Sequence, residues 1–155
     1  MTEAVTATFN LQLPTLNVQM ADKFNLEERL LDYAALIIHL VDNMDASYAG
    51  RHIGNQLLRS GTSPLFNHGE AQGAESQNDF IHKMGICLKE LRESRRALLL
   101  IRKVPLSRNT AHVESVLAET EELIRIFYTS IRTAKTNTCR EDSPAYGLSV
   151  LEVER

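Results

Sequence analysis

The chain is poor in the residues that support disulfide, zinc and β-sheet structures. Its 155 residues include two cysteines, Cys87 and Cys139, together with seven glycines and four prolines. Two cysteines without a C-x-x-C pair provide neither a disulfide framework nor a structural zinc site, so a reducing compartment fits best. Because the β-branched residues never form an extended run, we expect the secondary structure to be helical.

Long apolar runs and a large charge excess are also missing from the sequence. No segment approaches the about 18 uninterrupted apolar residues of a membrane span, and residues 1–20 lack the basic start and apolar run of a secretory signal. The chain has 17 basic and 20 acidic residues, and a net charge of −3 disfavours strong non-specific attraction to nucleic acid or anionic membranes. We therefore expect a soluble cytoplasmic protein that does not bind membranes.

Apolar residues spaced three and four positions apart predict helices. The first runs from about Leu26 to Met44 with Asn25 as its N-cap, and the third begins at the capping box Ser76–Asp79 and ends before Pro105. The fourth covers about Ala111 to Lys135. The third and fourth share a 3.5-residue period, which indicates antiparallel neighbours. The predicted fold class is an all-α, up-down-up-down antiparallel four-helix bundle.

The second helix, about Gly50 to Ala74, has an unfavourable centre at Ser60–Pro64. On propensity alone, glycine and proline would interrupt a helix there, so we expect tertiary packing to keep it continuous. Pro64 is expected to kink this helix, and Ser60 and Gly61 would allow a neighbouring backbone to approach closely.

The predicted helices define one compact domain, since a chain of this length can bury roughly 70% of its unfolded surface. Residues 25–136 form the predicted bundle. Residues 1–24 and 137–155 lack helical periodicity, and we expect them to be a flexible arm and a flexible tail.

A polar stripe on the second helix is the main candidate for a buried site. It consists of Arg59, Ser63, Asn67 and Glu70, with Glu90 or Glu93 of the third helix as partners for the arginine. A buried carboxylate beside an arginine can tune a catalytic pKa, which would suit a hydrolase. Because no nucleophile or second acid–base group accompanies it, we interpret the stripe, together with Glu90, as a buried network that fixes the register of the bundle.

Other reactive side chains have simpler interpretations. Asp79-x-x-His82 is the nearest approach to a metal motif, but the Glu-x-x-His pairs of di-metal bundles are missing from the sequence. We expect Asp79 to act as part of a helix cap, and Cys87 to behave as a small buried hydrophobe on an apolar seam. The sequence therefore predicts no catalytic residue, no metal site and no cofactor.

Charge is unevenly distributed along the chain. Residues 81–108 contain eight basic and two acidic residues, so this segment carries +6 and the remainder −9. Lys89, Arg92, Arg96 and Lys103 share one face of the third helix and could bind an anionic partner such as RNA. We favour the alternative, a solvated face that pairs with the acidic first and fourth helices, because no aromatic residues interleave with the cations for base stacking.

An ordered series of motifs resembles the bacterial 23S rRNA intervening-sequence proteins, and the resemblance extends over residues 26–135. The motifs are Leu26–Leu30, Gln56–Ser63, Asn67–Ala71, Ala74–Ser76, Asp79–Met84, Leu88–Glu93, Glu122–Phe127 and Ser130–Lys135. The resemblance implies an up-down-up-down bundle that assembles into a homopentamer, in a family without an established enzymatic activity. It also implies a fold similar to the accessory protein of diversity-generating retroelements, which binds a reverse transcriptase and nucleic acid through a basic surface.

The first helix is apolar over most of its circumference, because Leu31 and Ile38 add to the seam of Leu30, Ala34 and Ile37. This excess predicts a second packing surface. We predict a non-enzymatic, homo-oligomeric structural or interaction module, with itself as the main partner. The alternative function is an adaptor that binds RNA or a reverse transcriptase through the basic third helix.

Overall fold

The computed structural model describes residues 25–141 of the chain. Four helices make up this part: α2 (Leu26–Asp42), α3 (Tyr48–Gln72), α4 (Gln77–Lys103) and α5 (Thr110–Glu141). Within the same residues, the one β-type contact is an isolated bridge between Met44 and Ser107. None of these helices is both long and apolar enough to cross a membrane.

The helix starts follow local capping chemistry. The Asn25 side-chain oxygen accepts the Glu28 backbone N–H at 3.3 Å, and the Ser76 hydroxyl accepts the Asp79 backbone N–H at 3.1 Å. Both predicted N-caps are therefore confirmed, because each side chain satisfies a backbone donor that has no partner inside the helix.

The helix ends differ more from the expected bounds. α2 ends at Asp42 rather than Met44, and α5 continues to Glu141 rather than ending near Lys135. The predicted domain boundary at residue 136 thus falls inside α5, since the sequence has no glycine or proline between Lys135 and Pro144 to stop the helix. The predicted arm, residues 1–24, and the tail from residue 142 onward lie outside the described residues.

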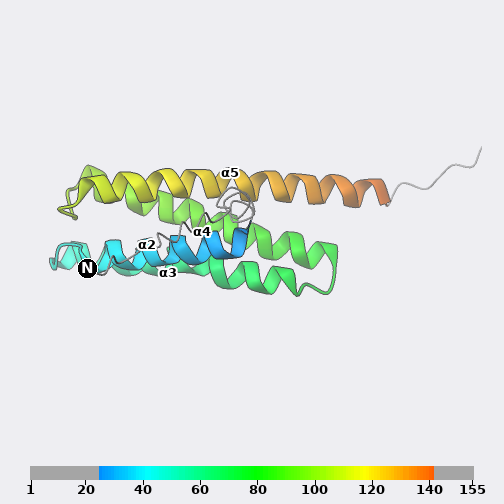
Figure 1. The fold of residues 1–155 in the computed structure, drawn as a ribbon, viewed down its shortest axis with the longest axis horizontal. Helices are drawn as coiled ribbons and strands as arrows, with labels where there is room; N and C mark the ends of the chain where they lie inside the picture. Colours follow the sequence, from blue (N-terminus) through cyan, green and yellow to red (C-terminus); the bar gives the residue numbers. More distant parts are fainter. Residues whose placement is uncertain (1–24, 142–155) are drawn as a thin grey trace, which may run out of the picture.

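The helices lie side by side as an all-α bundle, as predicted (Figure 1). α3 packs between α2 and α4, and α5 packs between α4 and α2. The colours of Figure 1 run in opposite directions along consecutive helices, which is compatible with the up-down-up-down topology. This order places α4 and α5 next to each other over much of their length.

The core is formed by the apolar seams, with a few buried hydroxyl groups among them. Its largest fully buried side chains include Tyr33, Phe127, Leu30, Ile37, Leu40, Leu57, Leu91 and Leu98. Between α3 and α4, the hydroxyls of Ser60 and Ser94 are 2.9 Å apart. Such hydrogen bonds satisfy polar groups that would otherwise be costly to bury.

α3 is continuous through Ser60–Pro64, and tertiary packing explains why. A Cβ atom on Gly61 would lie only 2.7 Å from Cγ1 of Ile37 on α2. The contact at Gly61 is therefore close, but a side chain of α2 makes it rather than the neighbouring backbone that we expected. Pro64 is buried in the same region, where its carbonyl oxygen accepts the Cys87 thiol at 3.6 Å.

Candidate functional site

The polar stripe of α3 does not form a single buried network. Arg59 has a side chain that is 67% exposed, and its Nη2 lies 3.0 Å from Oε1 of Glu93. Glu70 is exposed, and its carboxylate lies 3.6 Å from Nζ of Lys83. Glu90 is buried, and its Oε1 lies 3.7 Å from Nζ of the exposed Lys89. The expected burial of the arginine is thus wrong, and of the two partners considered for it, Glu93 is the one it meets.

Ser63 and Asn67, which are four residues apart on α3, form the hydrogen bonds that this spacing predicts. The Asn67 amide donates to the backbone carbonyl and to the hydroxyl of Ser63, both at 2.9 Å. Leu57, Gly61 and His68 occupy the buried face of α3, so the stripe lies at the edge of that face rather than in the core. An exposed ion pair such as Arg59–Glu93 contributes about 1 kcal/mol at most.

The thiol of Cys87 is poorly suited to nucleophilic chemistry. Burial raises its pKa to about 12, and the thiol remains protonated at neutral pH. His82 is exposed, and the Asp79 carboxylate lies 3.6 Å from Nζ of Lys83. Among residues 25–141, no group of three histidine, cysteine, aspartate or glutamate residues is placed to hold a metal ion.

His68 is a buried titratable group that the sequence did not single out. Its side chain packs edge-on against Phe127, with ring centroids 6.2 Å apart, and its Nε2 lies 3.2 Å from the Gln72 amide nitrogen. Burial lowers its pKa, which keeps the imidazole neutral at pH 7. Nδ1 has no hydrogen-bond partner within the described part of the chain.

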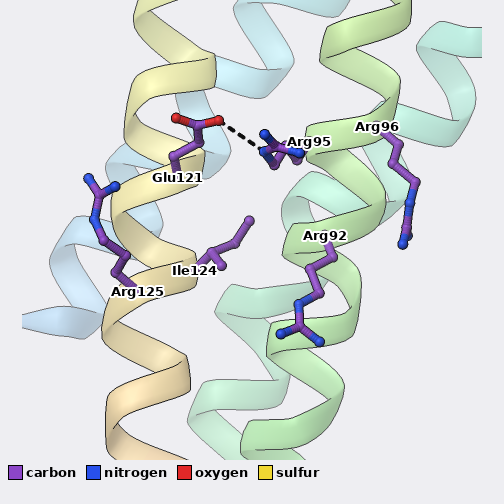
Figure 2. A pocket seen from close by; sticks show the side chains of 6 residues that line it. All are labelled: Arg92, Arg95, Arg96, Glu121, Ile124 and Arg125. Atoms are coloured by element: carbon purple, nitrogen blue, oxygen red, sulfur yellow. Dashed lines mark hydrogen bonds and ion pairs between the residues drawn. The ribbon is translucent and has the colours of Figure 1, made fainter.

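The strongest candidate site is an arginine-lined groove between α4 and α5 (Figure 2). It is open to solvent and has a volume of about 530 Å³. Its walls are formed by Arg92, Arg95, Arg96, Glu121, Ile124 and Arg125. We call this hollow the arginine groove.

Two of its four arginines are already engaged. Nε of Arg95 lies 2.9 Å from Oε1 of Glu121 and crosses between the helices, as Figure 2 shows. Arg125 pairs with Glu122 on its own helix. Arg92 and Arg96 make no ion pair with any described side chain, so their guanidinium groups keep all their donors available.

All four cations of the predicted face are exposed on α4, namely Lys89, Arg92, Arg96 and Lys103. We expected the basic segment 81–108 to pair with the acidic helices. Two other residues of α4 make such pairs. Arg95 pairs with Glu121, and Arg102 pairs with Glu114 at 3.4 Å. Both acids belong to α5, so in the part of the chain described here the acidic residues of α2 do not neutralise the basic face.

The sequence interpretation missed the contribution of α5 to this site. Arg125, Tyr128, Arg132 and Lys135 are spaced three, four and three residues apart and are all exposed. That spacing places them on one side of a helix. Of these four residues Arg125 lines the arginine groove, and assigning it there requires knowing that α5 packs against α4.

The comparisons with known proteins agree with the fold. The model of the family described as 23S rRNA-intervening sequence protein matches residues 23–129. A crystal structure of a protein of unknown function from the S23 ribosomal protein family of Bacteroides thetaiotaomicron VPI-5482 is 33% identical in sequence, with a TM-score of 0.61. The similarity covers 68% of this chain and 97% of that one.

A comparison with curated proteins gives no match. The family model alone covers well over half of the chain, and its range contains α2, α3, α4 and most of α5. Sequence motifs, helix order and the solved relative all lead to the same assignment. This chain belongs to the 23S rRNA-intervening sequence protein family.

Proposed function

We propose that the protein is a non-catalytic module that assembles with further copies of itself. The observation that carries this proposal is a second apolar stripe on α2. Leu30, Ala34 and Ile37 are buried in the bundle, whereas Leu31 is 56% and Ile38 43% exposed.

The exposed stripe has the spacing of a helix-packing seam. Leu31, Ala35 and Ile38 are four and three residues apart and all point out of the bundle. This is the repeat with which helices pack against one another in coiled coils and bundles. Tyr48 and Phe66 of the neighbouring helix α3 are also exposed.

A second copy of the chain is the occupant that we propose for this surface. Fully burying a leucine or isoleucine side chain is worth about 1.5–3 kcal/mol, so both partners gain when their stripes are covered. The family resemblance implies a homopentamer. A ring of five identical subunits requires a contact between two different faces of the subunit, because a self-complementary face closes after two copies.

The side-chain chemistry supports a non-catalytic role. The Cys87 thiol is held protonated by burial, and the arginine and carboxylates of the α3 stripe are separated and partly exposed. The protein then acts by presenting surfaces rather than by bond-making chemistry.

Substitution of the α2 stripe tests the proposal. We expect the double variant Leu31→Asp and Ile38→Asp to remain helical by circular dichroism, because both side chains point away from the core. Its mass by light scattering should fall to that of one chain, 17.5 kDa. The matched control is Leu100→Asp with Val104→Asp, which adds the same charge at exposed apolar positions of α4 and its C-cap.

The control should keep the mass of the wild-type assembly. If the α2 variant also kept that mass, the stripe would not be the assembly surface. If both variants dissociated, added charge rather than the stripe would account for the effect, and the proposal would fail.

A further inference from the structure

The arginine groove continues along the α4–α5 surface into a second hollow. This neighbouring hollow has a volume of about 420 Å³ and is lined by Asn78, Ile81, His82, Gly85, Ile86, Lys89 and Lys135. Lys89 and Arg92 are three residues apart on α4, which is less than one turn, so the two hollows follow each other directly. From Asn78 to Arg96 they extend over about 27 Å of helix.

We propose that this surface binds single-stranded nucleic acid. The phosphates would lie along α4 on Lys89, Arg92 and Arg96, and the bases would face α5. This inference goes beyond self-assembly and uses a different surface from the α2 stripe.

The charge of the surface fits a polyanion. Glu121 is the one acidic residue among those that line the two hollows, and it is engaged by Arg95. Arg92 and Arg96 carry planar guanidinium groups without an ion-pair partner among the described residues, and such groups bind phosphate oxygens with paired donors. An anion on this surface therefore meets two guanidinium groups that are not already neutralised, whereas Nζ of Lys89 lies 3.7 Å from Oε1 of Glu90.

The α5 side supplies an exposed aromatic group, whereas Phe80 of α4 is partly buried against the core. Tyr128 is 52% exposed and lies three residues after Arg125 and four before Arg132. An exposed ring between two cations is the arrangement on which bases stack while the backbone follows the positive charge.

Tyr128 itself lines neither hollow, but on α5 it lies about one turn after Ile124 and about two turns before Lys135, which line the first and the second hollow. A base stacked on this ring would therefore lie beside the two hollows.

An extended strand fits this surface better than an acidic peptide does. The hollows are shallow and succeed one another along the helices, so they offer little to enclose a compact ligand. An acidic peptide would use the cations but would gain little from a flat, exposed tyrosine ring. Because the whole chain has a net charge of −3, the protein outside this face repels anions, so binding should depend on this face and be sensitive to salt.

Fluorescence anisotropy with the full chain tests the proposal. The probe is a labelled, single-stranded RNA of about 12 nucleotides, within the range of site sizes known for such surfaces. We expect saturable binding whose logarithmic salt slope is about −0.7 per phosphate contact, or about −2 for Lys89, Arg92 and Arg96. Arg92→Glu with Arg96→Glu should weaken binding by about tenfold or more and reduce the slope by about 1.4.

Two further variants separate the groove from general charge. Tyr128→Ala should weaken binding by about fivefold or more while leaving the salt slope unchanged, because stacking involves no counterion release. The control Arg51→Glu with Arg108→Glu changes the net charge by the same amount at exposed positions outside the two hollows, and it should bind almost as wild type does. Light scattering of each variant checks that assembly is retained.

Several results would overturn the proposal. These are absence of saturable binding at about 50 mM salt, an equal loss in the charge-matched control, or retention of affinity by both groove variants. Equal competition by polyglutamate and by unlabelled RNA would assign the surface to acidic peptides instead. A fall in mass of the arginine variant without a change in RNA affinity would show that the groove serves assembly.

Discussion

Tyr33 combines the packing and the polar chemistry of the core in one residue. Its ring is fully buried, and its hydroxyl lies 2.9 Å from Oγ1 of Thr120. Thr120 donates its own proton to the Val116 carbonyl at 2.7 Å, so Tyr33 is the donor in the pair. Burial raises the pKa of Tyr33 from 10.0 to about 12, because the phenolate would lose its hydration.

Tyr33→Phe should therefore have a pH-dependent effect on stability. At pH 7 we expect the free energy of unfolding to fall by about 1 kcal/mol, the usual value of one buried hydrogen bond. The folded pKa exceeds the unfolded one, so the advantage of the tyrosine is complete below about pH 10 and declines as the pH rises toward 12. Urea unfolding of both proteins from neutral to alkaline pH measures the difference, and a difference that stayed constant would contradict this account.

Residues with local partners were predictable from the sequence, whereas residues with distant partners were not. Asn25 and Ser76 cap the helices that follow them, because the donors lie only three residues away. Arg59 was expected to be buried, but it meets Glu93 at an exposed position. Its environment depends on how α3 is rotated about its axis, and a polar stripe beside an apolar one fits both the core and its edge.

At the scale of the elements, α3 shows how packing overrides helix propensity. Its sequence places a glycine and a proline near the middle, yet the helix runs unbroken from Tyr48 to Gln72. Gly61 faces Ile37 of α2 at a distance that leaves no room for a Cβ atom, whereas a Cβ on Gly69 would meet nothing within 4 Å. The two glycines of one helix thus have opposite roles.

Alanine substitutions at these two glycines should change stability in opposite directions. Gly61→Ala should lower the free energy of unfolding by about 1–2 kcal/mol, since overpacking against Ile37 costs about 1–3 kcal/mol and outweighs the helix propensity gained. Gly69→Ala should raise it by up to about 1 kcal/mol. Chemical denaturation compares the two variants. Stabilisation by both would show that α2 and α3 are not in close contact at Gly61.

The α4 part of the candidate site was predictable from the sequence, whereas the α5 part was not. The 3.5-residue spacing identified the basic face of α4, because all its members belong to one element. Arg125 belongs to the site because α5 packs against α4, and this packing is not visible in the sequence of α5 alone. The predicted length of α5 was too short. The apolar periodicity weakens after Lys135, but the helix continues because no glycine or proline interrupts it before Pro144.

The whole molecule is a bundle with two distinct outward surfaces. The α2 side presents apolar residues such as Leu31 and Ile38, whereas the α4–α5 side presents cations such as Arg92 and Arg96. The sequence predicted the bundle because the first, third and fourth helices show regular apolar seams, whereas the second required the expectation that packing keeps it continuous. Assembly is a prediction from the excess of apolar surface on α2.

The mass of the unmodified chain in solution tests the central claim most directly. Light scattering coupled to size-exclusion chromatography at micromolar concentrations should give the mass of an assembly, and this mass should not change on dilution within that range. Five copies would have five times the chain mass of 17.5 kDa. A constant mass of one chain across the same concentrations would contradict the account, because the α2 stripe would then be exposed without a partner.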